Sequence, residues 1–352
     1  MIRLEIIDTA SGNILTPHLS ADLSFEMLRE NPLFNRCGDY TYDIDISLRD
    51  PHNRAIYQHI DRLTSTSRPQ GRRARLIADG RVIADGTEVV LKKEMDSVKI
   101  QILAGNSELN YITADKNLRL RDMDFGEVST EENTAAVATA NANKIFPAVN
   151  HTYPTCYKET DEEGVAILIN DAIATTSTLP DYIFTASFYP QPFLLFILER
   201  FVQLLGYTIG TNCLRDEPRW CRLIICSGYP TLKYAKMLPD WTAAEFIDEI
   251  EKFFGIVFVV NPITRVVDIA NLSAIQDNTV NEIADSIVLN DFERSYDETA
   301  DLLTNRVNVA YDLPTDTPFW RYAAIPDDIA RRCETVEVSS ASAIPRGVQD
   351  WT

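Results

Sequence analysis

RLIADGRVIA, residues 75–84, is the stretch that decides the fold of the first part of this chain. Two apolar runs flank Asp79-Gly80, and an Asp-Gly pair in that setting is the strongest short hairpin signal, because glycine readily adopts the positive φ of a tight turn. A second pair, Asp85-Gly86, precedes the apolar run 87–91, and a further strand is expected over 96–103. The stretch therefore predicts antiparallel β structure.

Apolar and polar residues alternate upstream of this hairpin as well. Leu4 and Ile6 show the pattern, and so do the alternating runs 23–27 and 40–48. A period of two indicates strands with one buried and one solvated face. Many short strands and no long helix predict a small barrel or sandwich over residues 1–115. The one long excursion, 50–72, is expected to hold a short helix near 54–63.

Two helix-plus-strand units are predicted farther along the chain. In the first, Pro192 suits a helix start, the apolar run 193–205 follows, and Gly206 suits a helix end before a strand at 207–209. In the second, Thr242 to Glu245 form a capping box, the helix ends at Gly255, and strands at 256–260 and 265–269 flank a turn. The region therefore predicts helices packed on a hairpin.

These patterns predict an α+β, multidomain chain. We expect a β domain at 1–115, a connecting or inserted region at 116–185, a helix-hairpin domain at 186–283, and a second β region at 284–352 that is possibly incomplete. Residues 131–143 fit a surface helix or a loop equally well, and 153–154 and 158–164 are interpreted as turns. Strands are expected at 223–225, 286–289, 305–311 and 336–338.

The 352 residues contain 33 basic and 52 acidic side chains, a formal net charge of −19. A chain that is 45% hydrophobic and 24% charged is globular rather than disordered. No apolar run reaches the roughly 20 residues of a membrane helix, and the first residues lack the pattern of a signal peptide. The acidic balance disfavours coating of DNA. Four arginines form either a local basic patch or a solvated loop: Arg68, Arg72, Arg73 and Arg75.

Metal-binding patterns are weak. Six scattered cysteines form no C-x-x-C pair, which makes structural zinc an unlikely prediction: Cys37, Cys156, Cys213, Cys221, Cys226 and Cys333. Free thiols are expected, although Cys213, Cys221 and Cys226 could pair in an exported protein. An acidic cluster suits either calcium or a solvated turn: Glu159, Asp161, Glu162 and Glu163.

Catalytic patterns are equally weak, and we predict a protein that is not an enzyme, with no catalytic, cofactor or metal residues. His52 and His59 lie seven residues apart, a poor spacing for metal binding, and neither His18 nor His151 has an assignable nucleophile. Cys226-Ser227-Gly228 is better explained as a turn than as a nucleophile. The carboxylate pairs and exposed aromatic candidates are Asp43 with Asp45, Asp122 with Asp124, and Trp220, Trp241, Trp320 and Trp351.

Several strings resemble a known family. Glu30-Asn31-Pro32-Leu33-Phe34, then Gly38 to Tyr42, then Asp50 to Arg54, resemble the opening of tail proteins of bacteriophages and prophages. The segments 238–246, 254–256 and 266–269 resemble the internal helix-hairpin unit of such proteins. The nearest group is the baseplate or tail-tip hub, related to the late-control proteins of contractile tails.

That resemblance implies a virion structural protein assembled in the bacterial cytoplasm. It implies a homotrimer whose subunits each carry two similar β domains, in a ring that joins the tail tube to the spike or tip proteins. From the acidic charge, the short apolar runs and the lack of cofactor motifs, we also predict no specific nucleic-acid binding, no membrane insertion and no cofactor. Two alternatives from other classes stay open: a carbohydrate-binding or adhesin module, and a cell-wall glycoside hydrolase.

Overall fold

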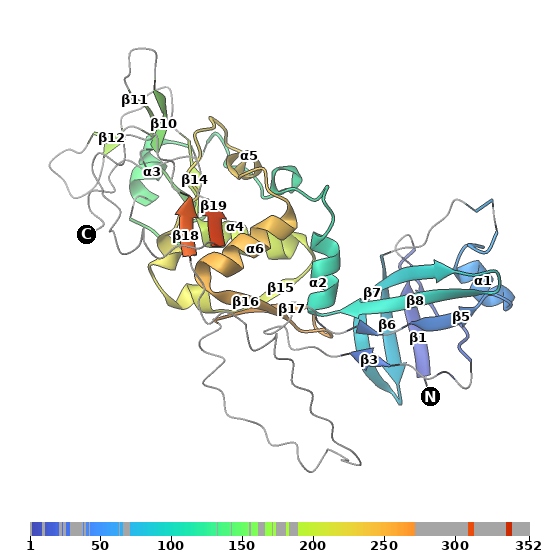
Figure 1. Ribbon diagram of the computed structural model, residues 1–352. Coiled ribbons are helices and arrows are strands. Elements are labelled where there is room, and N and C mark those ends of the chain that lie inside the picture. Colours follow the sequence, from blue (N-terminus) through green and yellow to red (C-terminus); the bar gives the residue numbers. More distant parts are fainter. Residues whose placement is uncertain are drawn as a thin grey trace, which may run out of the picture.

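A computed structural model describes most of residues 2–271 (Figure 1). The larger gaps in this description are 29–37, 66–70, 161–165, 174–180 and 183–188, and several single residues or pairs are also left out. Beyond residue 271 only 309–312 and 336–339 are described. The predicted strand 286–289 and the candidates Arg68, Trp320 and Trp351 lie outside these ranges.

The first part of the chain forms one eight-stranded sheet. The strand order is β2-β1-β6-β7-β8-β4-β3, and β5 also pairs with β8. All of these pairings are antiparallel, as the alternation predicted. The strands are β1 (Ile2–Ile7), β2 (Ile14–Leu15), β3 (Met27–Leu28), β4 (Tyr40–Thr41), β5 (Ile44–Ser47), β6 (Arg72–Ala78), β7 (Arg81–Lys93) and β8 (Ser97–Ala104).

The predicted hairpin is confirmed, and the second Asp-Gly pair is not a turn. Ala78 pairs with Arg81, and Asp79 and Gly80 have φ of 50° and 76°, as a two-residue hairpin turn requires. Gly86 instead lies inside β7, opposite Ala104. A Cβ atom there would stand 1.9 Å from the carbonyl oxygen of Leu103, so this glycine permits close approach of two strands.

The sheet curves around its own hydrophobic core. Every second residue of β8 is buried, and Ile44 and Ile46 of β5 are fully buried while Asp45 between them is exposed. The core also takes Leu4 and Ile6 from β1. Helix α1 (Pro51–Ile56) begins three residues earlier than predicted, because Asp50 caps its first turn and Pro51 fits the first helical position.

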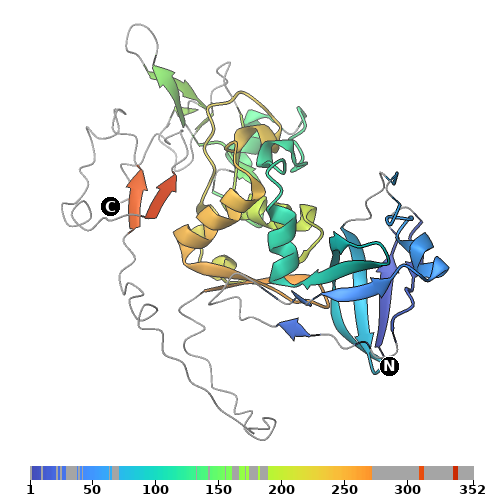
Figure 2. The same ribbon diagram turned by 45° about the vertical axis from the view of Figure 1, so that its right-hand side comes forward.

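The second part of the chain has a separate hydrophobic core, to which helices α2, α4 and α6 contribute. Both views show α2 standing between the first sheet and the helices α4 and α6 (Figures 1 and 2). The elements are α2 (Asn106–Thr113), η1 (Leu120–Asp122), α3 (Ala135–Asn141), β9 (His151–Thr152), β14 (Gln191–Pro192), α4 (Leu194–Leu204), β15 (Thr208–Asn212), η2 (Cys213–Asp216), η3 (Trp220–Arg222), α5 (Tyr234–Met237), α6 (Ala243–Phe254), β16 (Ile256–Val260) and β17 (Val266–Asn271).

The two predicted helix-strand units share a single small sheet. Strand β17 lies between β15, to which it is parallel, and β16, to which it is antiparallel. The capping box of α6 is present in both directions between Thr242 and Glu245. Gly206 and Gly255 have φ of 85° and 61°, the left-handed conformation expected after a helix.

The middle and the end of the chain contain short strands. Residues 135–141 are helical, which decides between the two alternatives for that stretch. The turn predicted from residue 158 is wrong for 158–160, which belong to the hairpin of β10 (Cys156–Thr160) and β11 (Ala166–Ile169). The strand predicted at 223–225 is also wrong, since Ile224 forms only an isolated bridge with Phe193.

The predicted final strand is confirmed as β19 (Val336–Ser339), parallel to β18 (Val309–Asp312). Two further short strands, β12 (Ala172–Ile173) and β13 (Asp181–Tyr182), pair with each other. The fold class, α+β with several sheets, is therefore confirmed, while the four domain ranges stay predictions.

Candidate functional site: open sheet edges held at a polar junction

Several strand edges of the first sheet have no strand partner among the described residues, and the short end strands β2 and β3 are among them. On one side β5 pairs only with β8, so no described strand covers its outer edge. On the other side β2 covers only Ile6 and Ile7 of β1, which leaves the outer edge of residues 2–5 open in the described part. Open edges present backbone N–H and C=O groups that can pair with another chain.

The sheet is joined to the second core by a tight backbone contact at the start of α2. The Asn106 side chain donates to the carbonyl oxygen of Phe258 at 2.6 Å and accepts from the N–H of Val260 at 2.8 Å. Gly105 precedes it with φ of 59°, and a Cβ there would lie 3.1 Å from the carbonyl oxygen of Val260. One asparagine thus extends the edge of β16 and fixes the helix against it.

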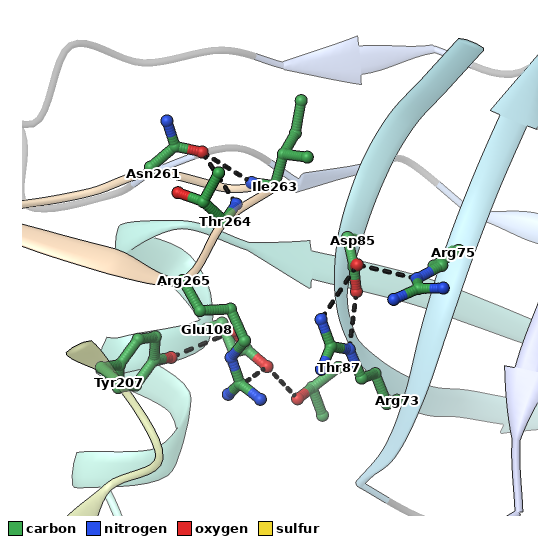
Figure 3. A network of polar contacts seen from close by, with 10 residues as sticks. All are labelled: Arg73, Arg75, Asp85, Thr87, Glu108, Tyr207, Asn261, Ile263, Thr264 and Arg265. Atoms are coloured by element: carbon green, nitrogen blue, oxygen red, sulfur yellow. Dashed lines mark hydrogen bonds and ion pairs between the residues drawn. The ribbon is translucent and has the colours of Figure 1, made fainter. Parts of the chain in front are cut away.

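Glu108 adds a buried carboxylate to this junction (Figure 3). Its residue is 2% exposed, and it accepts hydrogen bonds from Thr87 Oγ1 at 2.7 Å, Tyr207 Oη at 3.1 Å and Arg265 Nη2 at 3.1 Å. The three donors come from β7, from the turn after α4 and from the β16–β17 turn. The carboxylate therefore ties the first sheet to both helix-strand units.

The local sequence explains how Arg265 reaches this position. The Asn261 side chain accepts from the N–H groups of Ile263 and Thr264 at 2.9 and 3.0 Å, which closes the turn before Arg265 (Figure 3). The guanidinium also lies 4.7 Å from the centroid of the Tyr207 ring. Burial, and then the charge of Glu108, raise the pKa of Tyr207 above its usual value, so this phenol stays a neutral donor.

Of the four clustered arginines, the three that the structure describes form neither of the predicted alternatives, an unpaired basic patch or a solvated loop. Arg72 is buried on Glu88 at 2.8 Å, and Tyr57 donates to the same carboxylate at 2.7 Å. Arg73 and Arg75 both bind Asp85 (Figure 3). These three arginines lie on β6 and form cross-strand ion pairs with two carboxylates of β7, Glu88 and Asp85, so these two carboxylates offset most of their positive charge.

Two buried acids in this cluster, Tyr57 and Asp85, have a shifted pKa. Burial and then the charge of Glu88 raise the pKa of Tyr57 well above its usual value. Burial alone would raise the pKa of Asp85, but hydrogen bonds from Arg73 and Arg75 together outweigh it, and the net pKa is lowered. Both acids therefore stay in one protonation state near neutral pH.

The histidines do not form a catalytic set. His18 stacks on His52 with ring centroids 4.5 Å apart and contacts Asp50 through Nδ1 at 2.7 Å. His59 lies in the turn after α1, with φ of 54°. His151 lies far along the chain, and its two ring nitrogens contact the hydroxyls of Tyr234 at 2.7 Å and Tyr153 at 3.2 Å.

Ser227 lies in a structural turn, as predicted. The residue is 5% exposed, its hydroxyl accepts from the N–H of Tyr229 at 3.1 Å, and its own N–H donates to Gln191 at 2.6 Å. Cys213, Cys221 and Cys226 are free thiols. Burial raises the pKa of Cys213 and Cys221, which keeps these sulfurs protonated and unreactive near neutral pH.

The remaining candidates lie apart from one another. Asp43 and Asp45 are exposed, and so are Asp122 and Asp124. Trp220 packs edge-on against Phe254 at 5.1 Å, and Trp241 is partly buried against the second core. Of the acidic cluster, Glu159 lies in β10, and the three residues at 161–163 fall in a gap of the description.

Two other kinds of feature are absent from the described residues. No group of three or more histidine, cysteine, aspartate or glutamate side chains there could hold a metal ion. None of the helices in that part is long and apolar enough to cross a membrane. The sequence analysis did not identify Glu108 and Arg265, because no local pattern indicates that two residues 157 positions apart in the sequence are in contact.

Comparisons with known proteins give little sequence similarity. No protein-family model matches the chain, and no curated protein matches it either. Among solved structures, the chain is similar to the 43 kDa tail protein of prophage MuSo2 from Shewanella oneidensis, with 9% identity and a TM-score of 0.31. The similarity covers 77% of this chain and spans 56% of the length of that protein. At that TM-score neither a common fold nor a function can be transferred.

Proposed function

We propose that the chain is a non-enzymatic structural component of a phage or prophage tail, at the baseplate or tail-tip hub. In this role it assembles in the bacterial cytoplasm, forms a homotrimer, and joins the tail tube to the spike or tip proteins in the virion. The sequence strings 30–34, 38–42 and 50–54 support the family. The observation that carries the assembly role is that β5 and residues 2–5 of β1 have edges with no strand partner among the described residues.

Two open edges on one sheet suit a ring. If the edge at residues 2–5 of one copy pairs with β5 of the next, the same contact repeats head to tail, and such contacts close into a ring of three when each copy is rotated by one third of a turn without translation. The contacts of Asn106 and Glu108 oppose rotation of the sheet relative to the second core. This junction therefore keeps the second core in one position relative to the sheet edges that would pair.

The charge of the chain is compatible with this role. Pairing between strand edges relies on directional backbone hydrogen bonds, so it tolerates a protein with a net charge of −19. A negatively charged ring would also let DNA pass through its centre without binding it, since phosphates are repelled.

Light scattering combined with hydrogen exchange tests the assembly. We expect a trimeric mass at high protein concentration, and we expect the amides within residues 2–5 and 44–47 that point away from β6 and β8 to become protected as the trimer forms. Strand β7, paired on both sides within one copy, serves as the control because its protection should not change with concentration. A monomer at all concentrations, with both edges exchanging freely, would contradict the proposal.

The non-enzymatic part of the proposal has its own test. Purified peptidoglycan incubated with the protein should release no soluble fragments or new reducing ends, with a lysozyme reaction as the positive control. Release of fragments that depends on one carboxylate would instead support the glycoside hydrolase alternative.

A further inference from the structure

A groove of about 690 Å³ lies in the second part of the chain, away from the sheet edges and the junction. Helices α3, α4 and α5, the loop 125–128 and strand β9 all contribute to its walls. Its size falls within the range of sites that hold small ligands. Nothing in the proposed assembly role uses this groove.

One side of α4 faces the groove, and the pattern of its sequence explains why. Leu195, Leu198 and Phe201 are buried in the second core. Phe196, Arg200 and Gln203 follow at intervals of four and three residues, so they form a stripe on another face of the same helix, and all three line the groove. This stripe places an aromatic ring, a cation and an amide side by side.

Arg200 has no hydrogen bond or ion pair within the described part of the chain. The neighbouring Arg215, by contrast, binds both oxygens of Glu199. Among the groove residues, Glu127 is the acidic one, and it lies 3.9 Å from Lys233. Arg200 therefore offers a free guanidinium in a groove of an otherwise acidic protein, and a guanidinium fits a carboxylate with two parallel hydrogen bonds.

The residues around Arg200 supply held aromatic rings and two amides. His151 is held between two tyrosine hydroxyls, and the Phe196 ring meets the Tyr234 ring edge-on with centroids 5.0 Å apart. The amides of Asn150 and Gln203 line the groove, and within the described residues neither side chain has a hydrogen bond. A ligand with several hydroxyls could use both amides without moving the wall.

We propose that this groove binds an acidic saccharide, a sugar unit that carries a carboxylate. The carboxylate would pair with Arg200, the hydroxyls would bond to Asn150 and Gln203, and an apolar sugar face would pack on Phe196. An extended peptide is a poorer fit, because three of the walls are helices and offer side chains rather than an open strand edge for backbone pairing. The overall negative charge disfavours polyanions, so a ligand with few carboxylates fits best.

Isothermal titration with two acidic saccharides and their neutral counterparts tests the proposal. The probes are trigalacturonate with its methyl ester, and sialyllactose with lactose. We expect saturable binding of at least one acidic probe, and at least tenfold weaker binding of its neutral counterpart. Arg200→Gln should weaken that binding roughly ten- to hundredfold, the range for one charge-assisted hydrogen-bonding group.

Two controls keep the result interpretable. Arg222→Gln removes the same charge from an exposed position outside the groove and should leave binding unchanged. The thermal midpoint of Arg200→Gln should equal that of the wild type, since the side chain has no partner to lose. An acidic peptide and inorganic phosphate are titrated in parallel.

Several results would overturn the assignment. These are absence of saturable binding by both acidic saccharides at millimolar concentration, equal binding of the neutral counterparts, unchanged binding by Arg200→Gln, and preferential binding of the acidic peptide or of phosphate. None of these results tests whether the protein forms a trimer. The proposed ligand site and the proposed function can therefore be contradicted independently of each other.

Discussion

Replacing Glu108 with glutamine should loosen the connection between the two cores. The change removes the negative charge that balances Arg265. It also replaces the two carboxylate oxygens, which accept hydrogen bonds from Thr87, Tyr207 and Arg265, by a single carbonyl oxygen. Breaking a fully buried ion pair costs about 3–5 kcal/mol. The Arg265 side chain is 23% exposed, so water can partly solvate it, and we expect a loss of about 2–4 kcal/mol.

Native-state hydrogen exchange of the α2 amides is the assay, because a chain with two cores need not unfold in a single step. A double-mutant cycle of Glu108→Gln with Arg265→Met should give a coupling energy of about 1–3 kcal/mol. Glu127→Gln is the matched control, since its ion pair with Lys233 is exposed and should be worth less than about 1 kcal/mol. Strictly additive effects, or a loss no larger than that of the control, would refute the reasoning.

Three further predictions concern the sheet and the helix caps. Gly86→Ala should prevent folding of the first sheet, because the Cβ of the new alanine would clash with the backbone of β8. Soluble yield and circular dichroism measure the folding of this variant, and normal folding would contradict the prediction. Asp85→Asn should destabilise the protein at pH 7. The stability difference between the variant and the wild type should shrink below about pH 4, because the Asp85 carboxyl then protonates in the unfolded chain and the wild type loses the stability that its lowered pKa confers. Denaturant titrations at pH 7 and below pH 4 measure this difference. An equal difference at both pH values would contradict the prediction. Thr242→Ala should cost about 1 kcal/mol through loss of the α6 cap, seen as earlier exchange of the first α6 amides, whereas Thr264→Ala should not alter them.

Features set by neighbouring residues were predictable from the sequence. The Asp79-Gly80 turn and the capping box at Thr242 were predicted correctly, because each depends on a few adjacent residues whose conformations glycine, or a short polar side chain, selects directly. The same rule failed at Asp85-Gly86. There the glycine is needed for contact with a neighbouring strand, and no local pattern separates that need from a turn.

The candidate sites depended on residues that the sequence keeps far apart. Four clustered arginines suggested a basic patch or a loop, but strand pairing brought Glu88 and Asp85 of β7 within ion-pair distance of Arg72, Arg73 and Arg75 and offset most of their charge. Arg200 gave no signal in the sequence, and only the packing of α3, α4 and α5 placed it in a groove, where no described residue pairs with it.

The sequence by itself therefore determined an alternating β region, two helix-strand units, of which the second carries a capping box, and an acidic balance of charge. Tertiary structure alone decided the order of the strands, which edges stay open, and the meeting of Glu108 with Arg265 across 157 residues. The physical reason is the distance along the sequence over which each kind of interaction acts. Turn and cap preferences act over about four residues, whereas pairing and burial depend on how distant segments pack, and one amphipathic pattern is compatible with many such packings.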